Sequence, residues 1–535
     1  MKNIFNVIVP LFLIFISSAS AQKPEILWQF DTFDASYGQS AAADIDGDGR
    51  LEIVFGCYRN DSCVYALNAE NGSLLWKVNT SRPGKEGCND VAPLIYDING
   101  DGHLEVIVPS SCNDTTFCFD GRDGAVIWKT PTAGSDSPPI IDDIDGDGNM
   151  EILHGQFGGY VICIDARSGR IKWNLEVDTK SWVQTAPTIL DANGDGNSDF
   201  AVGTWNLASS AQSAYYVFEG KTQKLLWSYP VGNHIYHGSA AADIDSDGKM
   251  ELLVGAYNDT LYCFDAASGL VKWKYYGRGG YIGAPVTIAD FDGDGVCDIA
   301  FCSGYTIGVL NNKGNLLWKY NLPYIETAFR GVIAADINGD EYKDAIFCTS
   351  GGKLIALNGK KGEEIWKINI GEYSGIDKFD INHAPLIADF NGDGLLDIFF
   401  VGGFSEYPDF SKNRGRAYLL SIGKGNGPDW LMFQHDFRRR SALCGAQSVS
   451  VKEEFTSPQF SVIQDFDSRE ITFHSSSNLS GTAVIVNTLG QIMLKKGIEP
   501  KCKNKIDLDK IPAGAYYFMV KSSHGIELYG SMLLK

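Results

Sequence analysis

The chain has 535 residues, of which 44% are hydrophobic, and it carries a formal net charge of −21. That length and apolar content allow a large buried core, but the negative charge argues against nucleic acid as a partner, because phosphate binding needs clustered cationic side chains. The acidic residues recur in short glycine-containing segments, so the charge indicates metal-site chemistry.

Residues 1–21 have the pattern of a secretory signal peptide. Lys2 precedes an apolar run over residues 7–16, and Ala19, Ser20 and Ala21 form a small-residue cleavage site. The run is shorter than the roughly 18 apolar residues of a membrane helix, and no later stretch approaches that length. No cysteine follows the cleavage site directly, which argues against a lipid anchor there. We therefore expect an exported protein, secreted or on the cell surface, without a transmembrane segment.

A nine-residue acidic loop first occurs at residues 44–52 and recurs to give eight copies. Oxygen-bearing side chains at positions 1, 3, 5 and 9, with glycines at the sharp turns, are the ligand pattern of a hard cation, and calcium is the expected occupant. The alternative is a set of plain acidic turns, and the seventh copy is the weakest because Glu341 replaces a glycine. The predicted ligands are Asp44, Asp46, Asp48, Glu52, Asp97, Asn99, Asp101, Glu105, Asp143, Asp145, Asp147, Glu151, Asp191, Asn193, Asp195, Asp199, Asp243, Asp245, Asp247, Glu251, Asp290, Asp292, Asp294, Asp298, Asp336, Asn338, Asp340, Asp344, Asp389, Asn391, Asp393 and Asp397.

The loops are spaced 46 to 53 residues apart, a period typical of propeller blades. Each interval predicts four short strands, which in the first unit are residues 40–43, 52–56, 64–67 and 74–78. In most units a turn that ends in glycine precedes the fourth strand, and in each of the seven intervals between loops a tryptophan stands in that strand. We expect these tryptophans to pack between neighbouring blades. They are Trp76, Trp128, Trp173, Trp227, Trp273, Trp318 and Trp366.

Trp28 stands in a similar strand before the first loop, without the three strands that should precede it. The last unit correspondingly has inner strands near Leu386, Ile398 and Tyr418. We expect the N-terminal strand to supply the outer strand of the last blade and so close the ring. Trp430 is a competitor for that position.

Twelve cysteines in an exported chain permit disulfides. Two pairs bracket short turns between predicted strands, and a hairpin could join Cys57 to Cys63 and Cys112 to Cys118. Cys118 alternatively shares a buried repeat position with two other cysteines. The sequence leaves open the pairing of Cys88, Cys297, Cys302, Cys348, Cys444 and Cys502.

The pattern changes after Cys444, where the metal loops and tryptophan hairpins stop. Residues 447–535 therefore form a second domain. Short alternating segments such as 481–486 and 516–520 predict a small Ig-like β-sandwich.

At this point two resemblances are visible. The acidic loops, with lead-ins such as Gly283-Ala284-Pro285, resemble FG-GAP (VCBS) repeats, and the Gly-x-x-x-Trp hairpins resemble quinoprotein-like propeller blades. Over about residues 24–445 this implies an all-β fold with an eight-bladed β-propeller at residues 22–446 and calcium in the loop between the first and second strands of each blade. No quinone cofactor is expected, because the chain lacks the adjacent cysteine pair of quinoprotein dehydrogenases.

The C-terminal segment has a resemblance of its own. The turn at Leu489, Gly490 and Gln491 and the segment 508–520 resemble the C-terminal sorting domain of the type IX secretion system. That resemblance implies a Bacteroidetes-type bacterium, export across the outer membrane and the type IX machinery as a partner. An ordinary Ig-like binding module is the alternative.

Strand direction alternates within a blade, so the metal loops lie on one face and the blade-to-blade connections lie on the other. Varied loops on a repeated scaffold are the usual binding sites, and these connections should rim one central funnel. Their polar and aromatic residues include Asn89, Asp90, Asp136, Gln184, Phe329 and Asn382. The ligand-binding candidates are Trp182, His234, Tyr236, His237, Tyr281, Arg330 and His383.

Histidine, tyrosine and arginine together could bind an acidic sugar or abstract a proton beside a uronate carboxylate. A purely hydrogen-bonded loop at residues 233–237 is the plainer interpretation. Two functions remain: a protein that binds a glycan or protein ligand, and a lyase acting on uronate polysaccharides, since some rhamnogalacturonan lyases are eight-bladed calcium propellers that this chain loosely resembles. The absence of a G-x-S-x-G motif and of paired acids outside the loops favours binding.

Overall fold

The computed structural model describes residues 23–406, 408–445, 454–456, 460–465, 470–475, 481–487, 492–499, 503–508, 514–522 and 525–534. The chain divides into two compact units, Met1–Gln447 and Ser448–Lys535. The expected signal peptide at residues 1–21, the turn at 489–491 and Cys502 lie outside the described residues.

The first unit is an eight-bladed β-propeller, as predicted from the repeat. Eight antiparallel four-stranded sheets follow one another, each ordered from inner to outer strand. Blades 1 to 4 consist of β2 (Ser40–Ala43), β3 (Glu52–Gly56), β4 (Cys63–Asn68), β5 (Leu74–Asn79); β6 (Leu94–Tyr96), β7 (Glu105–Ser110), β8 (Thr115–Asp120), β9 (Val126–Pro131); β10 (Ile140–Asp142), β11 (Glu151–Gly155), β12 (Tyr160–Asp165), β13 (Ile171–Glu176); and β15 (Thr188–Leu190), β16 (Asp199–Gly203), β18 (Ala214–Glu219), β19 (Leu225–Pro230).

The second half of the ring repeats this arrangement. Blades 5 to 8 consist of β20 (Ser239–Ala242), β21 (Glu251–Ala256), β22 (Thr260–Asp265), β23 (Val271–Tyr276); β24 (Thr287–Ala289), β25 (Asp298–Ser303), β26 (Thr306–Leu310), β27 (Leu316–Asn321); β28 (Ile333–Ala335), β29 (Asp344–Cys348), β30 (Lys353–Leu357), β31 (Glu364–Asn369); and β32 (Leu386–Ala388), β33 (Leu396–Phe404), β34 (Arg414–Gly423), β1 (Glu25–Thr32). Smaller elements lie in the connections between the strands. They are the two-stranded ribbon of β14 (Ser181–Trp182) and β17 (Trp205–Asn206), the helix α1 (Ile370–Ser374), and 3-10 turns at Ser210–Gln212 and Phe410–Lys412.

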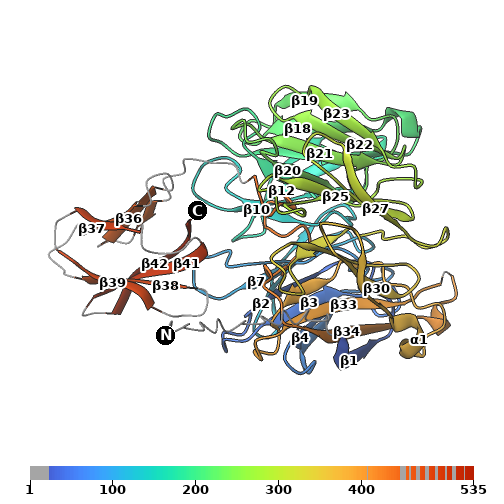
Figure 1. Ribbon diagram of the computed structural model, residues 1–535, viewed down its shortest axis with the longest axis horizontal. Helices are drawn as coiled ribbons and strands as arrows, with labels where there is room; N and C mark the ends of the chain where they lie inside the picture. The colour runs from blue at the N-terminus through green and yellow to red at the C-terminus, as the bar shows by residue number, and fades with distance from the viewer. Residues whose placement is uncertain are drawn as a thin grey trace, which may run out of the picture. The chain divides into compact units, whose positions relative to one another are not determined.

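The ring closes through the N-terminal strand. β1 pairs antiparallel with β34, with Trp28 opposite Leu419, and the two strands lie side by side in Figure 1, β1 in dark blue and β34 in orange. The predicted closure is therefore confirmed. Because strands almost 400 residues apart in sequence complete one sheet, with Glu25 opposite Ser421, opening the ring requires breaking a whole strand pair.

The tryptophans pack between blades, as predicted. Trp76 of blade 1 donates its indole N–H to the Gly121 carbonyl of blade 2 at 2.6 Å, and its ring lies against the next turn glycine. A Cβ on Gly124 would come within 2.9 Å of that ring, and the residue also has φ +73°. The same contact joins Trp28 to Gly72, where a Cβ would meet the ring at 2.6 Å. Glycine is thus required at these turns by both backbone angle and space.

Residues 424–445, here called the central segment, run along the inner edges of the inner strands. Its backbone pairs with strands of blades 1, 4, 5, 6, 7 and 8, and side chains reach the remaining two. The contacts are Ala42 N to Leu431 O (2.8 Å), Ile189 N to Arg438 O (2.9 Å), Ala241 N to Arg440 O (2.9 Å), Ile288 N to Ser441 O (2.9 Å), Asp336 N to Gly427 O (2.7 Å), Trp430 N to Ile387 O (2.7 Å), Arg439 Nε to Pro139 O (3.3 Å) and the Tyr96–Phe437 ring pair (5.2 Å).

Trp430 belongs to this segment and is only 2% exposed. It does not compete with β1 for the outer edge of the last blade, so that alternative is wrong. The segment satisfies backbone donors on the inner strands that would otherwise lack partners in the narrow centre of the ring.

The disulfides differ from both predicted hairpin pairs. Cys88 pairs with Cys112, and Cys297 pairs with Cys444 of the central segment. Cys57, Cys63 and Cys118 are free and buried. The hairpin predictions were wrong because these free cysteines lie within or beside blade strands, where their side chains fill the core.

The second unit contains two four-stranded sheets. One is ordered β35 (Glu454–Thr456), β36 (Phe460–Asp465), β37 (Glu470–Ser475), β40 (Lys503–Asp507); the other is ordered β39 (Ile492–Ile498), β38 (Gly481–Asn487), β41 (Gly514–Ser522), β42 (Gly525–Leu534). Phe473, Ile485 and Phe518 belong to one buried cluster shared by the two sheets. The Ig-like topology stays a prediction.

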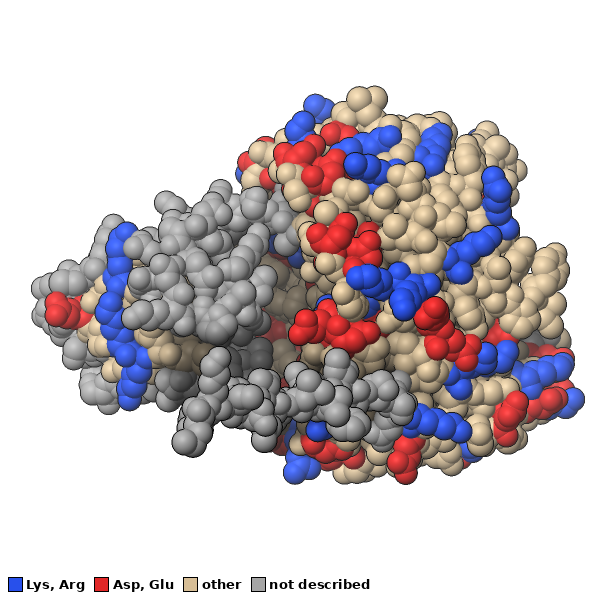
Figure 2. All heavy atoms as spheres, in the orientation of Figure 1, with Lys and Arg blue, Asp and Glu red and all other residues tan. Residues whose placement is uncertain are grey.

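Among the described residues, no helix is long and apolar enough to cross a membrane. On the face drawn in Figure 2, acidic and basic side chains lie beside one another over the propeller, without a continuous basic patch among the residues described there.

Candidate functional site

Each acidic loop joins the first and second strands of its blade, where the repeat resemblance places it. In the first loop the backbone N–H groups of Gly47 and Gly49 donate to the two oxygens of Asp44, at 2.8 and 3.0 Å. The carboxylate of Glu52 accepts from the N–H of Ile45 at 2.9 Å. These bonds fold the loop so that its carboxylates converge, and ligand atoms of Asp44, Asp46 and Asp48 lie within 4.8 Å of one another.

The carboxylate at position 9 is buried in all eight loops, at 0 to 3% exposure. Burial raises the pKa of Glu52 to about 7 and that of Asp344 to about 8. Glu52 Oε1, Asp199 Oδ1 and Asp397 Oδ1 are buried without a hydrogen-bond partner in the described part of the chain. An orphaned buried carboxylate oxygen costs free energy unless a cation reaches it, so these loops fit a divalent ion with oxygen ligands.

At the opposite end of the ring, Arg330 joins groups from several blades. Its Nη1 donates to Nδ1 of His237 at 2.9 Å, and its Nη2 donates to the Tyr37 carbonyl. The guanidinium carbon also lies 5.6 Å from the centre of the Phe329 ring. His237 is 2% exposed, and burial, aided by the Arg330 charge, holds its pKa well below the ordinary value. His237 is therefore a neutral acceptor.

Three carboxylates share the electrostatic field of Arg330. Burial raises the pKa of Asp136 to about 7, with a further contribution from Asp90, and burial likewise raises that of Asp380 to about 7. The Arg330 charge opposes the increase for Asp90, Asp136 and Asp380 alike. These acids come from three different blade connections, so only the closed ring places them around one arginine.

The carboxylates are held by neighbouring polar groups. Asp136 accepts from Gln184 Nε2 at 2.7 Å and from the Tyr236 hydroxyl at 3.4 Å. Asp90 accepts from the Ser111 hydroxyl at 2.6 Å. Oδ1 of Asp136 has no hydrogen-bond partner among the described residues, so it can accept from a further donor.

Aromatic rings form a wall beside this polar cluster. His234 stacks on Trp205 with centroids 4.0 Å apart and an interplanar angle of 1°. Trp205 contacts Tyr257 edge-on at 5.0 Å, and Tyr257 stacks on Tyr281 at 4.8 Å. The wall meets the polar cluster where Tyr281 approaches Phe329 at 6.2 Å.

The closed ring brings the predicted funnel residues together, and the Arg330 charge acts on His383 as well as on His237. Tyr236 lies 3.7 Å from His237 between ring centroids, and Trp182 faces Trp205 in the β14–β17 ribbon. His383 is 1% exposed, accepts or donates a 2.7 Å hydrogen bond with Ser40, and has its pKa lowered to about 3 by burial. His383 is therefore an uncharged, buried residue that packs beneath the funnel and is held by Ser40.

Sequence reasoning missed two groups of residues. Trp205 and Tyr257, like Tyr58 and Phe157, stand six residues after position 9 of their loops. This regular spacing was a readable signal, because it puts the residue in the turn after the second strand, on the funnel face. Asp380 had no such signal, since its connection is long and irregular.

Several polar atoms of the funnel lack partners. Asp136 Oδ1, Asp380 Oδ1 and Arg330 Nε are buried without a hydrogen bond among the described residues. Buried polar groups are normally satisfied, so unpaired donors and acceptors in one place indicate a site that completes its bonds with a ligand or bound water.

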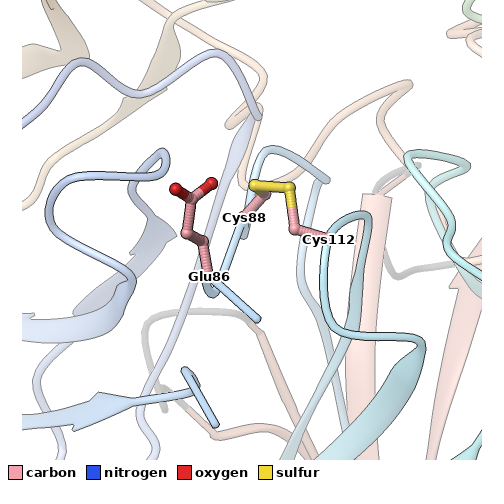
Figure 3. Close-up of side chains that lie close together, drawn as sticks. All are labelled: Glu86, Cys88 and Cys112. Atoms are coloured by element: carbon pink, nitrogen blue, oxygen red, sulfur yellow. A yellow bond between two sulfur atoms is a disulfide. The ribbon is translucent and has the colours of Figure 1, made fainter. Parts of the chain in front are cut away.

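A disulfide stands beside this site. Figure 3 shows Glu86 near the bonded sulfurs of Cys88 and Cys112. Both sulfurs are engaged in that bond, so they cannot act as the thiolates that a soft metal needs. The bond instead ties the connection bearing Asp90 to the β7–β8 turn bearing Ser111.

Comparison with known proteins gives two family matches. The profile described as "Outer membrane protein assembly factor BamB" matches residues 113–247 and 158–414, which together cover more than half of the chain. The profile described as "FG-GAP-like repeat" matches residues 44–108, over the first two acidic loops.

Individual relatives are distant. The chain is 23% identical over 425 residues to "Cartilage acidic protein 1" of Xenopus tropicalis, covering 71% of this chain and 59% of that protein. It is 23% identical to "Rhamnogalacturonan endolyase YesW" of Bacillus subtilis, covering 42% and 38%. The chain thus spans less than two thirds of either relative. Quinohemoprotein alcohol dehydrogenase from Comamonas testosteroni matches in fold, with a TM-score of 0.55, 12% identity, and coverage of 77% of this chain and 79% of that one.

Proposed function

The chain belongs to the family described as "Outer membrane protein assembly factor BamB", and on this propeller scaffold we propose that it is an exported, calcium-stabilised protein that binds a glycan in its funnel. A propeller scaffold does not itself specify a ligand. The observation that carries the proposal is the cluster of Asp136, Tyr236, His237 and Arg330, drawn from three blade connections and containing unpaired polar atoms.

Calcium has a structural role in this proposal. The acidic loops lie at the end of the ring opposite the funnel, so ions there do not touch a ligand. Loops 1, 3, 5 and 6 present converging carboxylate oxygens, and position 9 is buried in all eight loops. A bound ion would neutralise these carboxylates. Ion binding to the folded chain alone adds stability by linkage.

The charges of the funnel favour an uncharged, hydroxyl-rich ligand. Arg330 is surrounded by Asp90, Asp136 and Asp380, while His237 is neutral. A uronate would meet these carboxylates as well as the single guanidinium. Sugar hydroxyls can instead donate to Asp136 Oδ1 and Asp380 Oδ1 and accept from Arg330 Nε, and a sugar face can pack on the aromatic wall. This replaces the acidic sugar expected from the sequence.

The test is binding of the intact protein to neutral and uronate oligosaccharides, followed by calorimetry on the best ligand. Neutral glycans should bind, and Asp136→Asn should weaken them, because an amide is a poorer acceptor than a carboxylate. Selective binding of uronates would contradict the charge argument. Exclusive binding of a protein partner would contradict the glycan assignment.

A lyase is the second candidate, favoured by the partial similarity to a rhamnogalacturonan endolyase. Tyr236 and neutral His237 lie 3.7 Å apart between centroids, beside Arg330, and such a pair could accept and deliver a proton next to a carboxylate. Incubation with uronate polysaccharides, following the unsaturated product, decides between the two. Turnover that Tyr236→Phe abolishes would make the protein a lyase.

The export route is proposed from the ends of the chain. Residues 1–21 would direct export, and residues 447–535 would be recognised by the type IX machinery of a Bacteroidetes-type bacterium. Expression with and without the second unit in such a bacterium tests this. Normal surface delivery of the shortened chain would contradict the sorting role.

A further inference from the structure

Three of the eight acidic loops have the same four ligand residues. Loops 1, 3 and 5 each carry aspartate at positions 1, 3 and 5 and glutamate at position 9; these glutamates are Glu52, Glu151 and Glu251. All three glutamates are 0% exposed, and all three accept from the N–H of the residue at position 2. The three loops are therefore matched in their ligand side chains, although loop 5 has Ser246 where the other two have glycine.

What distinguishes loops 3 and 5 from loop 1 is a lysine. Lys172 Nζ lies 2.6 Å from Asp145 Oδ2, 3.1 Å from Asp147 Oδ2 and 2.9 Å from Glu151 Oε1. In the fifth loop, Lys272 Nζ lies 2.6 Å from Asp245 Oδ2 and 2.7 Å from Glu251 Oε1. The equivalent oxygen of the first loop, Glu52 Oε1, is buried without a partner among the described residues.

A β-bulge places these lysines. In every blade the outer strand slips by one residue beside its tryptophan; in blade 3, Cys163 pairs with Trp173 while Ile164 pairs with Ile171, so Lys172 is the extra residue. A bulge re-aims its side chain. The other blades have leucine or isoleucine in this place: Leu75, Ile127, Leu226, Leu317, Ile365 and Leu27. An apolar side chain cannot neutralise the loop, so at this bulge position only blades 3 and 5 supply a cation.

From this geometry we infer that Lys172 and Lys272 act as tethered counter-ions. Loops 3 and 5 then hold an ammonium group where the loops of blades without a lysine at the bulge hold calcium. An ion that drew oxygens to roughly 2.3–2.6 Å would need the volume that each Nζ occupies, and the two positive charges would repel. The inference rests on the proposed calcium binding, and it predicts that the chain takes up at least two ions fewer than it has loops.

The test counts calcium per chain by equilibrium dialysis and elemental analysis of the full-length protein. The double variant Lys172→Leu/Lys272→Leu, which copies the bulge residue of other blades, should bind two more ions than the wild type. Leu75→Lys in the matched first loop should bind one fewer. Equal counts in wild type and double variant, with calcium bound to both, would overturn the inference while leaving the calcium proposal intact. If neither binds calcium, the proposed calcium role fails and this inference fails with it.

A second measurement does not depend on variants that fold. Amine-labelling rates of Lys172 and Lys272, measured by mass spectrometry, should be the same with chelator and with saturating calcium, because the ammonium groups stay in their loops. Lys221, on an exposed turn, is the reference. Calcium-induced acceleration at Lys172 or Lys272 would show that the ion displaces the lysine.

Discussion

Arg330 and His237, 93 residues apart in sequence, are joined by a 2.9 Å hydrogen bond between Nη1 and Nδ1. The bond spans from the connection before blade 5 to the connection before blade 7, so it exists only because the ring is closed. It leaves Arg330 Nε unpaired among the described residues, and the funnel chemistry is organised around this guanidinium.

Replacing Arg330 by alanine should weaken glycan binding by about 1.5–3 kcal/mol, the range for a lost hydrogen bond to a charged group, which corresponds to a roughly 10- to 150-fold increase in Kd. Calorimetry with the neutral oligosaccharide that binds best to the wild-type protein measures the loss. Arg82→Ala is the matched control, because that side chain is 52% exposed in a salt bridge with Asp114. Equal effects of the two changes would place the ligand elsewhere on the ring.

Asp136 makes stability depend on pH. Its pKa in the folded protein is raised to about 7, above the ordinary 3.8. The contribution of Asp136 to the free energy of unfolding is therefore undiminished below about pH 4, where Asp136 is protonated in both states, and it decreases as the pH rises through 7. Asp136→Asn stays uncharged and should therefore stabilise the protein at pH 8, by on the order of 1 kcal/mol, and much less at pH 5. Thermal unfolding at both pH values measures this.

Glu363→Gln is the control for that comparison, since its side chain is 73% exposed. A gain in Tm for Asp136→Asn that is the same at pH 5 and pH 8 would contradict a raised pKa.

Removing calcium should lower Tm, and the effect can be assigned to one loop. A saturated site adds about 2.7 kcal/mol at a free ion concentration 100 times its Kd. Glu52→Gln keeps an acceptor for the Ile45 N–H but removes the buried charge, so it should reduce the calcium-induced rise in Tm. Glu176→Gln, on the exposed outer strand β13, should leave the rise unchanged. An identical calcium response in wild type and Glu52→Gln would show that loop 1 binds no ion.

The central segment should be required for the ring, and the second unit should not. A chain ending at Gln447 retains the contacts of residues 424–445 with the inner strands and should unfold with the wild-type propeller transition. A chain ending at Gly423 loses backbone bonds to six inner strands and the Cys297–Cys444 disulfide, so it should be strongly destabilised. Circular dichroism during thermal unfolding compares the two. Equal stability of both would mean that the segment merely fills space.

Trp430→Ala tests the same segment by a single change. Its side chain is 2% exposed in the core, and truncating a buried tryptophan costs about 3–5 kcal/mol. Denaturant unfolding of the chain ending at Gln447 gives the value. Phe437, which is 36% exposed, provides the comparison, and its change to alanine should cost less.

The sequence by itself determined the ring. Eight acidic loops at a 46- to 53-residue period predicted eight blades, and Trp28 predicted the closing strand, because each of these features depends on local turn chemistry that repeats. Loop position, strand order and the packing of tryptophan on glycine all follow from one unit. The same local logic shows which residues lie on the funnel face, and it would have included Trp205 and Tyr257 had the spacing after position 9 been used.

Only the tertiary structure decided what those residues do together. Four features join residues from different strands or blades, and a single repeat does not predict them. They are the approach of Arg330 to Asp90, Asp136 and Asp380, the path of the central segment, the pairing of Cys88 with Cys112, and the contact of Lys172 with its loop. A repeat states which turn a residue occupies, but the direction of its side chain depends on how irregular connections pack around a closed ring. That packing is a property of the whole circle, and no single unit encodes it.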